Sequence, residues 1–245
     1  MRLQLGLILT LSFLINSVGF SQETARSLYD QGKYQEALEV LNKSGLSTAS
    51  DYYNAGNVYF RLGKVGQALA YYEKANALSP NVPDIRFNLN LAKDSLEKSG
   101  SLPKDKSFWL GTFIPLARQI PEEFVDLLLA VVTVGFALVC LRLKRLGLTV
   151  QKAVTQSSFL TTLGIWALTC ALTAGTIIAH RTKMAAVVAD LSSARSGPNE
   201  TFTELFKLPA GTTVHLTGET REGWHQVRFS LGNVGWIGDK DLIAL

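Results

Sequence analysis

Two long apolar runs divide the chain into three parts. Residues 124–141 and 159–179 are almost uninterrupted hydrophobic sequence, and the second run contains no charged residue. About 20 apolar residues in a helix are enough to cross the hydrocarbon core of a membrane, which is roughly 30 Å thick. The pattern therefore predicts transmembrane helices over 122–141 and 159–179, joined by a loop over 142–158.

A third, shorter apolar run lies at the N-terminus. Arg2 precedes the apolar residues 3–15, and small residues follow at Gly19 and Ser21. This order is typical of a secretory signal peptide, here over residues 1–21, with cleavage before Gln22. An uncleaved membrane anchor is the alternative, but 13 residues are few for a membrane span.

The loop over 142–158 indicates the orientation in the membrane. It carries four basic residues and no acidic one, which favours the cytoplasmic side. The predicted signal peptide leads to the same topology. It exports the N-terminal region, the first span then returns the chain to the cytoplasm, and the second span takes it out again. We therefore expect a multi-pass protein of the bacterial inner membrane, with both soluble parts on the periplasmic or outer side.

Small residues recur at every fourth position of the second apolar run, at Ala167, Ala171, Gly175 and Ala179. Such a stripe lets two helix backbones approach closely. It predicts packing against the first span of the same chain, with the spans of a partner protein as the alternative. The flanking segments are read as a linker over 100–121, whose aromatic residues suit the membrane interface, and a tether over 180–193.

The exported part contains a 34-residue helical repeat. Its best copy has aromatic, glycine, alanine and proline residues at the spacing of the tetratricopeptide repeat: Tyr52, Gly56, Tyr59, Gly63, Ala68, Tyr72, Ala75 and Pro80. An imperfect copy precedes it, and a single helix with a polar outer face follows it. Residues 22–99 are thus predicted to form an α-solenoid ending in a capping helix.

The concave face of such a solenoid is its expected binding groove. We expect Tyr53, Asn54, Asn57, Arg61 and Asn88 to line it. Asn57 and Asn88 lie 31 residues apart and resemble the asparagine pair that binds a C-terminal carboxylate in some tetratricopeptide domains. Tyr53 occupies the position of the lysine in those clamps, so the alternative is a plain polar groove for a protein or peptide.

The C-terminal residues 194–245 alternate short apolar strands with glycine turns. Four landmarks in order resemble a bacterial SH3-like domain: Arg195-Ser196-Gly197-Pro198, Pro209-Ala210-Gly211, Gly223-Trp224 and Gly235-Trp236-Ile237. The resemblance implies a small β-barrel that binds cell-wall peptides or proteins. Trp224, Arg228 and Trp236 are the expected ligand surface, although a small barrel also uses tryptophan in its core.

Charge and cysteine content argue against several functions. The net charge of +4 comes from Arg2 and from residues 101–158, while the two soluble regions are each neutral, so the basic pI indicates no nucleic-acid partner. Cys140 and Cys170 both lie in apolar runs. We find no catalytic constellation, metal-ligand spacing or phosphate-binding loop, and expect a non-enzymatic protein without cofactor or metal.

The full order of elements is a signal peptide, tetratricopeptide repeats, two spans and an SH3-like module. The chain thereby resembles BatE-type proteins of the aerotolerance (Bat) operon. The resemblance implies an envelope component linked to stress tolerance, encoded beside membrane proteins with von Willebrand factor A domains. The expected fold is multidomain α plus β, and the expected function is a scaffold for membrane or periplasmic proteins, with peptidoglycan binding or sensing as the alternative.

Overall fold

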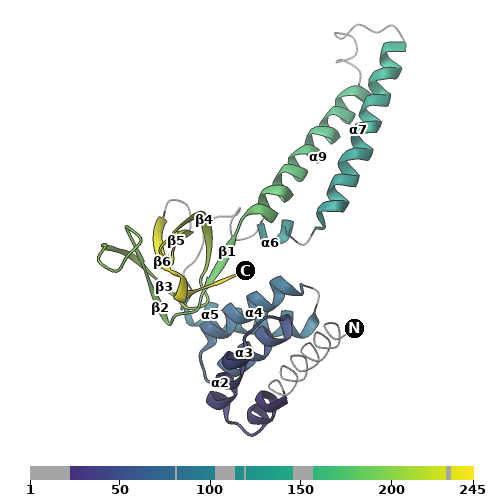
Figure 1. Ribbon diagram of the computed structural model, residues 1–245. Coiled ribbons are helices and arrows are strands. Elements are labelled where there is room, and N and C mark those ends of the chain that lie inside the picture. The colour runs from purple at the N-terminus through teal and green to yellow at the C-terminus, as the bar shows by residue number, and fades with distance from the viewer. Residues whose placement is uncertain (1–22, 81, 103–113, 119, 146–156, 230–232) are drawn as a thin grey trace, which may run out of the picture. The chain divides into compact units, whose positions relative to one another are not determined.

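The computed structural model describes most of the chain outside the N-terminal segment and several connections (Figure 1). The described residues are 23–80, 82–102, 114–118, 120–145, 157–229 and 233–245. They form two compact units, one combining the N-terminal helices with the C-terminal strands and the other containing the long apolar helices. The predicted signal peptide, the aromatic residues of the linker and most of the basic loop lie outside the described residues.

The N-terminal region consists of consecutive antiparallel helices, as the repeat predicts (Figure 1). A first helix over 23–30 is followed by α2 (Tyr34–Ser44), α3 (Ala49–Arg61), α4 (Val65–Leu78) and α5 (Pro83–Ser99). Helices α3 and α4 make the most extensive contact, and α5 covers the next face of α4. The array therefore ends with α5 as a single unpaired helix, which agrees with the predicted cap.

The repeat residues have clear packing roles. Tyr72 of α4 is almost completely buried, and its ring lies so close to Gly56 of α3 that a Cβ there would be 2.6 Å from the ring. Gly63, in the turn between the two helices, has a φ of 75°, which glycine adopts without strain. Thr48 and Asp51 form a capping box at the start of α3. These contacts explain why the glycines and the tyrosine recur at that spacing.

The C-terminal region is one antiparallel seven-stranded sheet. Its strands are β1 (Met184–Val187), β2 (Leu191–Arg195), β3 (Glu204–Pro209), β4 (Thr213–Arg221), β5 (Trp224–Phe229), β6 (Asn233–Gly238) and β7 (Leu242–Ala244). Their order is β3-β2-β6-β5-β4-β1-β7. The expected small β-barrel is not closed, because β3 and β7 are the two edges of the sheet and no hydrogen bonds pair them among the described residues.

The C-terminal strands β1 to β7, which we call the β-module, also begin earlier in the chain than expected. The predicted tether over 180–193 contains β1 and most of β2, so the sheet starts at Met184 rather than at 194. β1 is paired with β4 and β7, and all four of its residues are buried: Ala185 and Val187 belong to the apolar cluster of the module, and α4 contacts the strand. Its sequence shows no alternation of apolar and polar residues, because a strand covered on both faces does not need one.

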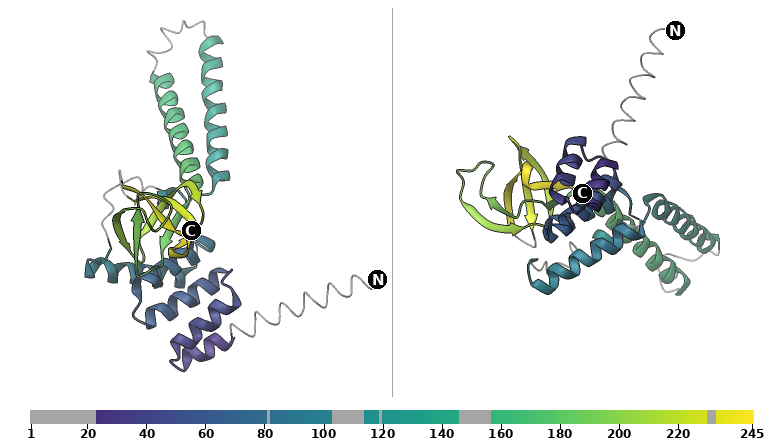
Figure 2. Two further views of the ribbon diagram at one scale, coloured as in Figure 1. Left: turned by 60° about the vertical axis from the view of Figure 1, so that its left-hand side comes forward. Right: turned by 90° about the horizontal axis from the view of Figure 1, so that it is seen from below.

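The second unit is a helical hairpin of α7 (Glu122–Arg145) and α9 (Ser157–Arg181), preceded by the short helix α6 (Ile114–Ala117). Both views in Figure 2 show the two long helices side by side. Their apolar stretches, over 123–145 and 159–181, are long enough to cross a membrane, with mean hydropathies of 2.6 and 1.7. Each helix extends beyond its predicted span, and α7 carries a cluster of basic residues in its last turn.

The two long helices meet through residues spaced alternately three and four positions apart. On α7 the partly or fully buried residues with described side chains are apolar: Val125, Leu129, Val132, Phe136, Val139, Cys140 and Leu143. On α9 they include Trp166, whose ring stacks on Phe136 with centroids 5.6 Å apart and whose N–H donates to Thr133. Spacing of this kind is typical of helices that pack along a shallow left-handed crossing.

Threonines rather than the predicted small-residue stripe line the rest of this contact. Thr169, Thr173 and Thr176 are buried, whereas Ala167 and Ala171 are exposed. The expected packing of the stripe is therefore wrong for its first half, whereas Gly175 is partly buried and Ala179 fully buried. Each buried threonine hydroxyl donates to a carbonyl of its own helix, 2.8 to 2.9 Å away, so it needs no partner on α7.

The end of α9 is capped by the segment that follows α6. The guanidinium of Arg118 donates from Nε to the carbonyl of Ala179 at 3.0 Å, and its second nitrogen donates to the carbonyl of Thr182. These carbonyls lie in the last turn of α9 and just beyond it, where they lack partners within the helix. A cation there is also favourable for the helix dipole. Arg118 thus stabilises the exit of the second apolar helix.

Within the first unit, α4 packs against the β-module. Gly66 approaches the turn before β4 so closely that a Cβ on it would lie 2.6 Å from the carbonyl oxygen of Ala210. Gly211, next in the turn, has a φ of 81° and lies against the backbone of Gly66 and the side chain of Leu69. The other contacts of α4 on this side are with β1 and β7. One face of α4 therefore belongs to the helical repeats and the other to the sheet.

Candidate functional site

A hydrogen-bonded cluster joins α3, α4 and α5 at the predicted asparagine pair. Asn57 Oδ1 accepts two hydrogen bonds, from the Tyr72 hydroxyl at 2.8 Å and from Asn88 Nδ2 at 2.9 Å. Asn88 Nδ2 also donates to the Tyr53 hydroxyl at 3.1 Å. The structure thus brings together three of the five expected groove residues, Tyr53, Asn57 and Asn88, and adds Tyr72. We call these four residues the asparagine cluster.

The polarity of the asparagine cluster follows from these bonds. Burial raises the pKa of Tyr72, so its hydroxyl keeps its proton and donates to Asn57. Asn57 then presents its amide N–H groups and Asn88 its amide oxygen, neither of which has a partner within the described part of the chain. A donor lies beside an acceptor. This pair complements the C=O and N–H of a peptide group, whereas a carboxylate needs donors only.

The other two predicted groove residues lie outside the asparagine cluster. Arg61, at the end of α3, donates from Nε to the Tyr29 hydroxyl at 3.1 Å, and its guanidinium lies 5.8 Å from the centre of that ring. This contact raises the pKa of Arg61 and ties the end of α3 to the first helix. Asn54 is a partly buried residue of α3.

Apolar side chains flank the asparagine cluster on α5, and the sequence analysis missed them. Phe87 is 69% exposed and Leu91 45% exposed. They lie four positions apart, on one face of the helix that also carries Asn88. The helix pattern contained the signal, since Phe87 and Leu91 break the otherwise polar outer face of the predicted cap. Exposed apolar residues of this size beside unpaired polar atoms are typical of a protein-binding surface.

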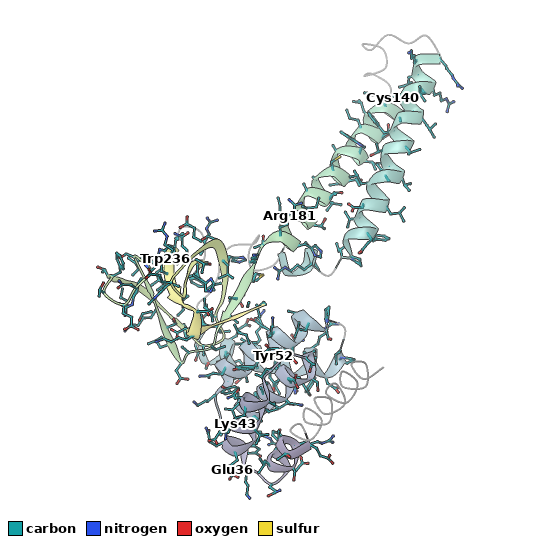
Figure 3. All side chains as sticks on the ribbon, viewed as in Figure 1. Glu36, Lys43, Tyr52, Cys140, Arg181 and Trp236 are labelled. Carbon is teal, nitrogen blue, oxygen red and sulfur yellow. The ribbon has the colours of Figure 1, made fainter. Side chains whose placement is uncertain are left out.

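The three predicted SH3-like surface residues lie on one face of the sheet. Trp224 and Arg228 lie four positions apart on β5, so their side chains are on the same face of the sheet. Trp236 of β6 is paired with Gln226, which lies midway between them on that face. Trp236, labelled in Figure 3, is only 7% exposed, and the guanidinium of Arg221 lies 5.9 Å from the centre of its ring. Neither tryptophan belongs to the main apolar cluster of the module. Of the two tryptophans, Trp224 is the more accessible.

A small cavity of about 210 Å³ adjoins Trp224. Its lining also includes two glycines and three charged residues: Glu200, Gly223, Gly238, Asp239 and Lys240. At this end of the sheet, both ring nitrogens of His225 have hydrogen-bond partners. Nδ1 lies 3.1 Å from the Thr220 hydroxyl, and Nε2 lies 3.0 Å from Asp239 Oδ1. The lining mixes one aromatic surface with both signs of charge, which suits a small polar group of a peptide.

Polar side chains also lie between α4 and the β-module. Gln67 of α4 donates to Asp190, in the turn before β2. Two turns along α4, the carboxyl oxygens of Glu73 accept from the Thr213 hydroxyl at 3.0 and 3.1 Å. Burial raises the pKa of Glu73 to about 7, against the opposing effects of Thr213 and of the Lys93 cation. This carboxyl is therefore poised to change protonation near neutral pH.

One comparison with known proteins identifies part of the chain. Residues 49–82, which span α3 and α4, match the family model for the tetratricopeptide repeat. Among curated proteins, none matches the chain. The match confirms the predicted repeat, and tetratricopeptide repeats are protein-interaction modules. The signal peptide, the SH3-like module and the resemblance to BatE-type proteins stay predictions.

Proposed function

We propose that this protein is a non-enzymatic membrane adaptor that binds another protein through the helices of its tetratricopeptide region. The observation that carries the proposal is the surface on α3 and α5, where the asparagine cluster lies beside exposed Phe87 and Leu91. Solenoids of this kind bind extended segments of a partner along the groove formed by the first helix of each repeat, here α3 and α5. The polar pair suits a peptide group of the partner, and the apolar pair suits its side chains.

The chemistry of the asparagine cluster favours an internal segment of the partner over its C-terminus. The amide oxygen of Asn88 would repel a carboxylate, and Tyr53 supplies no positive charge in place of a lysine. A carboxylate clamp is therefore the weaker reading of the asparagine pair.

The topology supports a membrane location. Helices over 23–99 and strands over 184–244 form one unit, although the two apolar helices lie between them in the chain. A chain that leaves this unit and returns to it crosses a membrane an even number of times, which two spans satisfy. The basic residues that end α7 then lie on the cytoplasmic side. The soluble unit accordingly faces the periplasm or the outside, among possible partners such as von Willebrand factor A proteins of a Bat-type operon.

The test is crosslinking in intact cells, followed by purification of the tagged chain and mass spectrometry of the proteins recovered with it. Phe87→Ser with Leu91→Ser should reduce partner recovery at least tenfold, since both side chains are exposed and the fold does not depend on them. Leu78→Ser is the matched control, because Leu78 is also 45% exposed but lies on α4. Equal recovery with the double variant and the control would refute the proposed surface.

Peptidoglycan binding by the β-module is the second candidate, favoured by the cavity beside Trp224. Sedimentation of the full chain in detergent with purified peptidoglycan measures it. Trp224→Ala should lower the bound fraction if the cavity takes a wall peptide, with Trp109→Ala, in the linker, as the control. Full binding by both variants, or by neither, counts against this function.

A further inference from the structure

The contact between α4 and the β-module contains an acidic side chain that the proposed function does not use. Glu73 is partly buried there, and its nearest polar partner is the Thr213 hydroxyl of β4. That hydroxyl is the one hydrogen-bond donor to the two carboxyl oxygens within the described part of the chain, and it replaces only part of the hydration that a charged carboxylate loses on burial. We propose that the β-module docks on α4 with uptake of one proton by Glu73, so that docking tightens as the pH falls.

The surroundings of Glu73 supply little positive charge. Lys93 of α5 acts on the carboxyl, but its effect is smaller than that of burial. Strands β1 and β7, which cover this side of α4, have the sequences MAAV and LIA and carry no ionisable side chain. His215 lies two residues beyond Thr213 on β4 and is buried. Within the described part of the chain, no ion pair joins Glu73 to a cation.

The remaining charged groups of the neighbouring helix segments are directed elsewhere. Lys74, the next residue on α4, lies over the ring of Tyr52 at 5.8 Å. On α3, Asp51 is held by the capping box, and Arg61 contacts Tyr29 at the opposite end of the helix. At the other end of the docking contact, Asp190 accepts from the amide of Gln67. Glu73 is therefore the carboxyl group of this contact whose pKa burial brings close to neutral pH.

The direction of the effect follows from linkage. The pKa of Glu73 is about 7 in the docked chain and has an ordinary value of 4.5, which it recovers when exposed. The docked state thus holds the proton at pH values where the undocked state has lost it. Docking strengthens as the pH falls from 7 toward 4.5 and is constant beyond these limits. Between pH 7.5 and 5.5 the docking constant rises about 20-fold.

This coupling gives the exported unit a response to acidity. At low pH the β-module is held against α4, and at higher pH it is released while the membrane hairpin still tethers it. The α3–α5 surface carries a separate set of residues, so its partner binding and the docking of the β-module are measured independently.

The first test is the titration of Glu73 in the full chain, in detergent micelles, by the side-chain carbonyl resonances of 13C-labelled glutamate. Glu73→Gln identifies the resonance by its loss. We expect a midpoint near 7, returning to between 4 and 5 in Ala210→Arg, which separates the turn from Gly66. A midpoint below 5 in the native chain, or an unchanged midpoint in the variant, overturns the proposal.

The second test measures docking itself by energy transfer between dyes. They are attached at Lys43→Cys and Lys207→Cys, both exposed, in a chain whose two native cysteines are replaced by serine. In a Gly66→Ala background, which weakens the contact, the docked fraction should rise with falling pH. Glu73→Gln should abolish this dependence, while the exposed control Glu36→Gln keeps it. A dependence that survives Glu73→Gln refutes the assignment.

Discussion

Helices α4 and α9 both bury polar side chains against a neighbour, but they satisfy them in different ways. The threonine hydroxyls of α9 donate to carbonyls of the same helix. On α4, Gln67 and Glu73 have partners on the β-module. A self-satisfied group stays satisfied when its neighbour leaves, whereas a group paired across a contact loses its partner. Among the described residues, the α7–α9 contact therefore depends on shape apart from the hydrogen bond from Trp166 to Thr133, and the α4 contact depends on both shape and chemistry.

The largest effect is expected where shape is most restrictive. Gly66→Leu places a side chain where the backbone of Ala210 lies, so we expect it to undock the β-module and to lower the stability of the first unit by about 2 kcal/mol. Chemical denaturation of the full chain in detergent and the energy-transfer measurement report the two effects.

The same change at Ala77 is the control for Gly66→Leu. Ala77 is an exposed residue of α4, where leucine is tolerated well, so Ala77→Leu should change neither quantity measurably. Retention of docking by Gly66→Leu would show that the close approach of α4 to the turn is not required.

A smaller effect is expected for Thr213→Val, which removes the hydrogen bond across the α4 contact without changing the size of the side chain. Docking at pH 8 should weaken by about 1 kcal/mol, because the Glu73 carboxylate loses its donor. The Thr213 hydrogen bond lowers the pKa of Glu73, so its removal should raise that pKa further. Titration of Glu73 in the variant checks the sign, and a lower midpoint would contradict it.

The smallest effect is expected for the identical change on α9. Thr173→Val removes a hydroxyl that is bonded only within its own helix, so the stability of the hairpin should change by less than about 0.5 kcal/mol. Reversible unfolding of the full chain in mixed micelles measures it. A loss equal to that of Thr213→Val would mean that the hydroxyl of Thr173 serves α7, and the contrast between the two helices would fail.

Local patterns predicted much of this fold. The repeat spacing located α3 and α4, because Gly56 and Tyr72 meet wherever those two helices pair. The apolar runs located α7 and α9 to within a few residues, because helix length in a membrane follows from hydrophobic length alone. Asn57 and Asn88 also lie together in the structure, since adjacent repeats place equivalent positions side by side.

The misses share a physical cause. Strand β1 was taken for a tether because its buried, small residues lack a periodic pattern. Trp236 was expected on the ligand surface, with the core as the alternative, but it is buried, and Arg221 of β4, two strands away in the sheet, lies over its ring. The α9 contact was assigned to the alanines, although threonines that bond to their own helix pack there equally well. In each case the deciding atom lies on another element, which local sequence does not specify.

The sequence by itself determined the repeat, the two apolar helices and the strand-rich C-terminus, since each depends on interactions within a few residues or one helix turn. Only the tertiary structure decided that α4 carries the β-module and that Glu73 lies at their contact. Such pairings depend on a close fit between surfaces far apart in the chain, here between Gly66 and Ala210. They also depend on burial, which changes the pKa of Glu73 without any signal in its neighbouring residues.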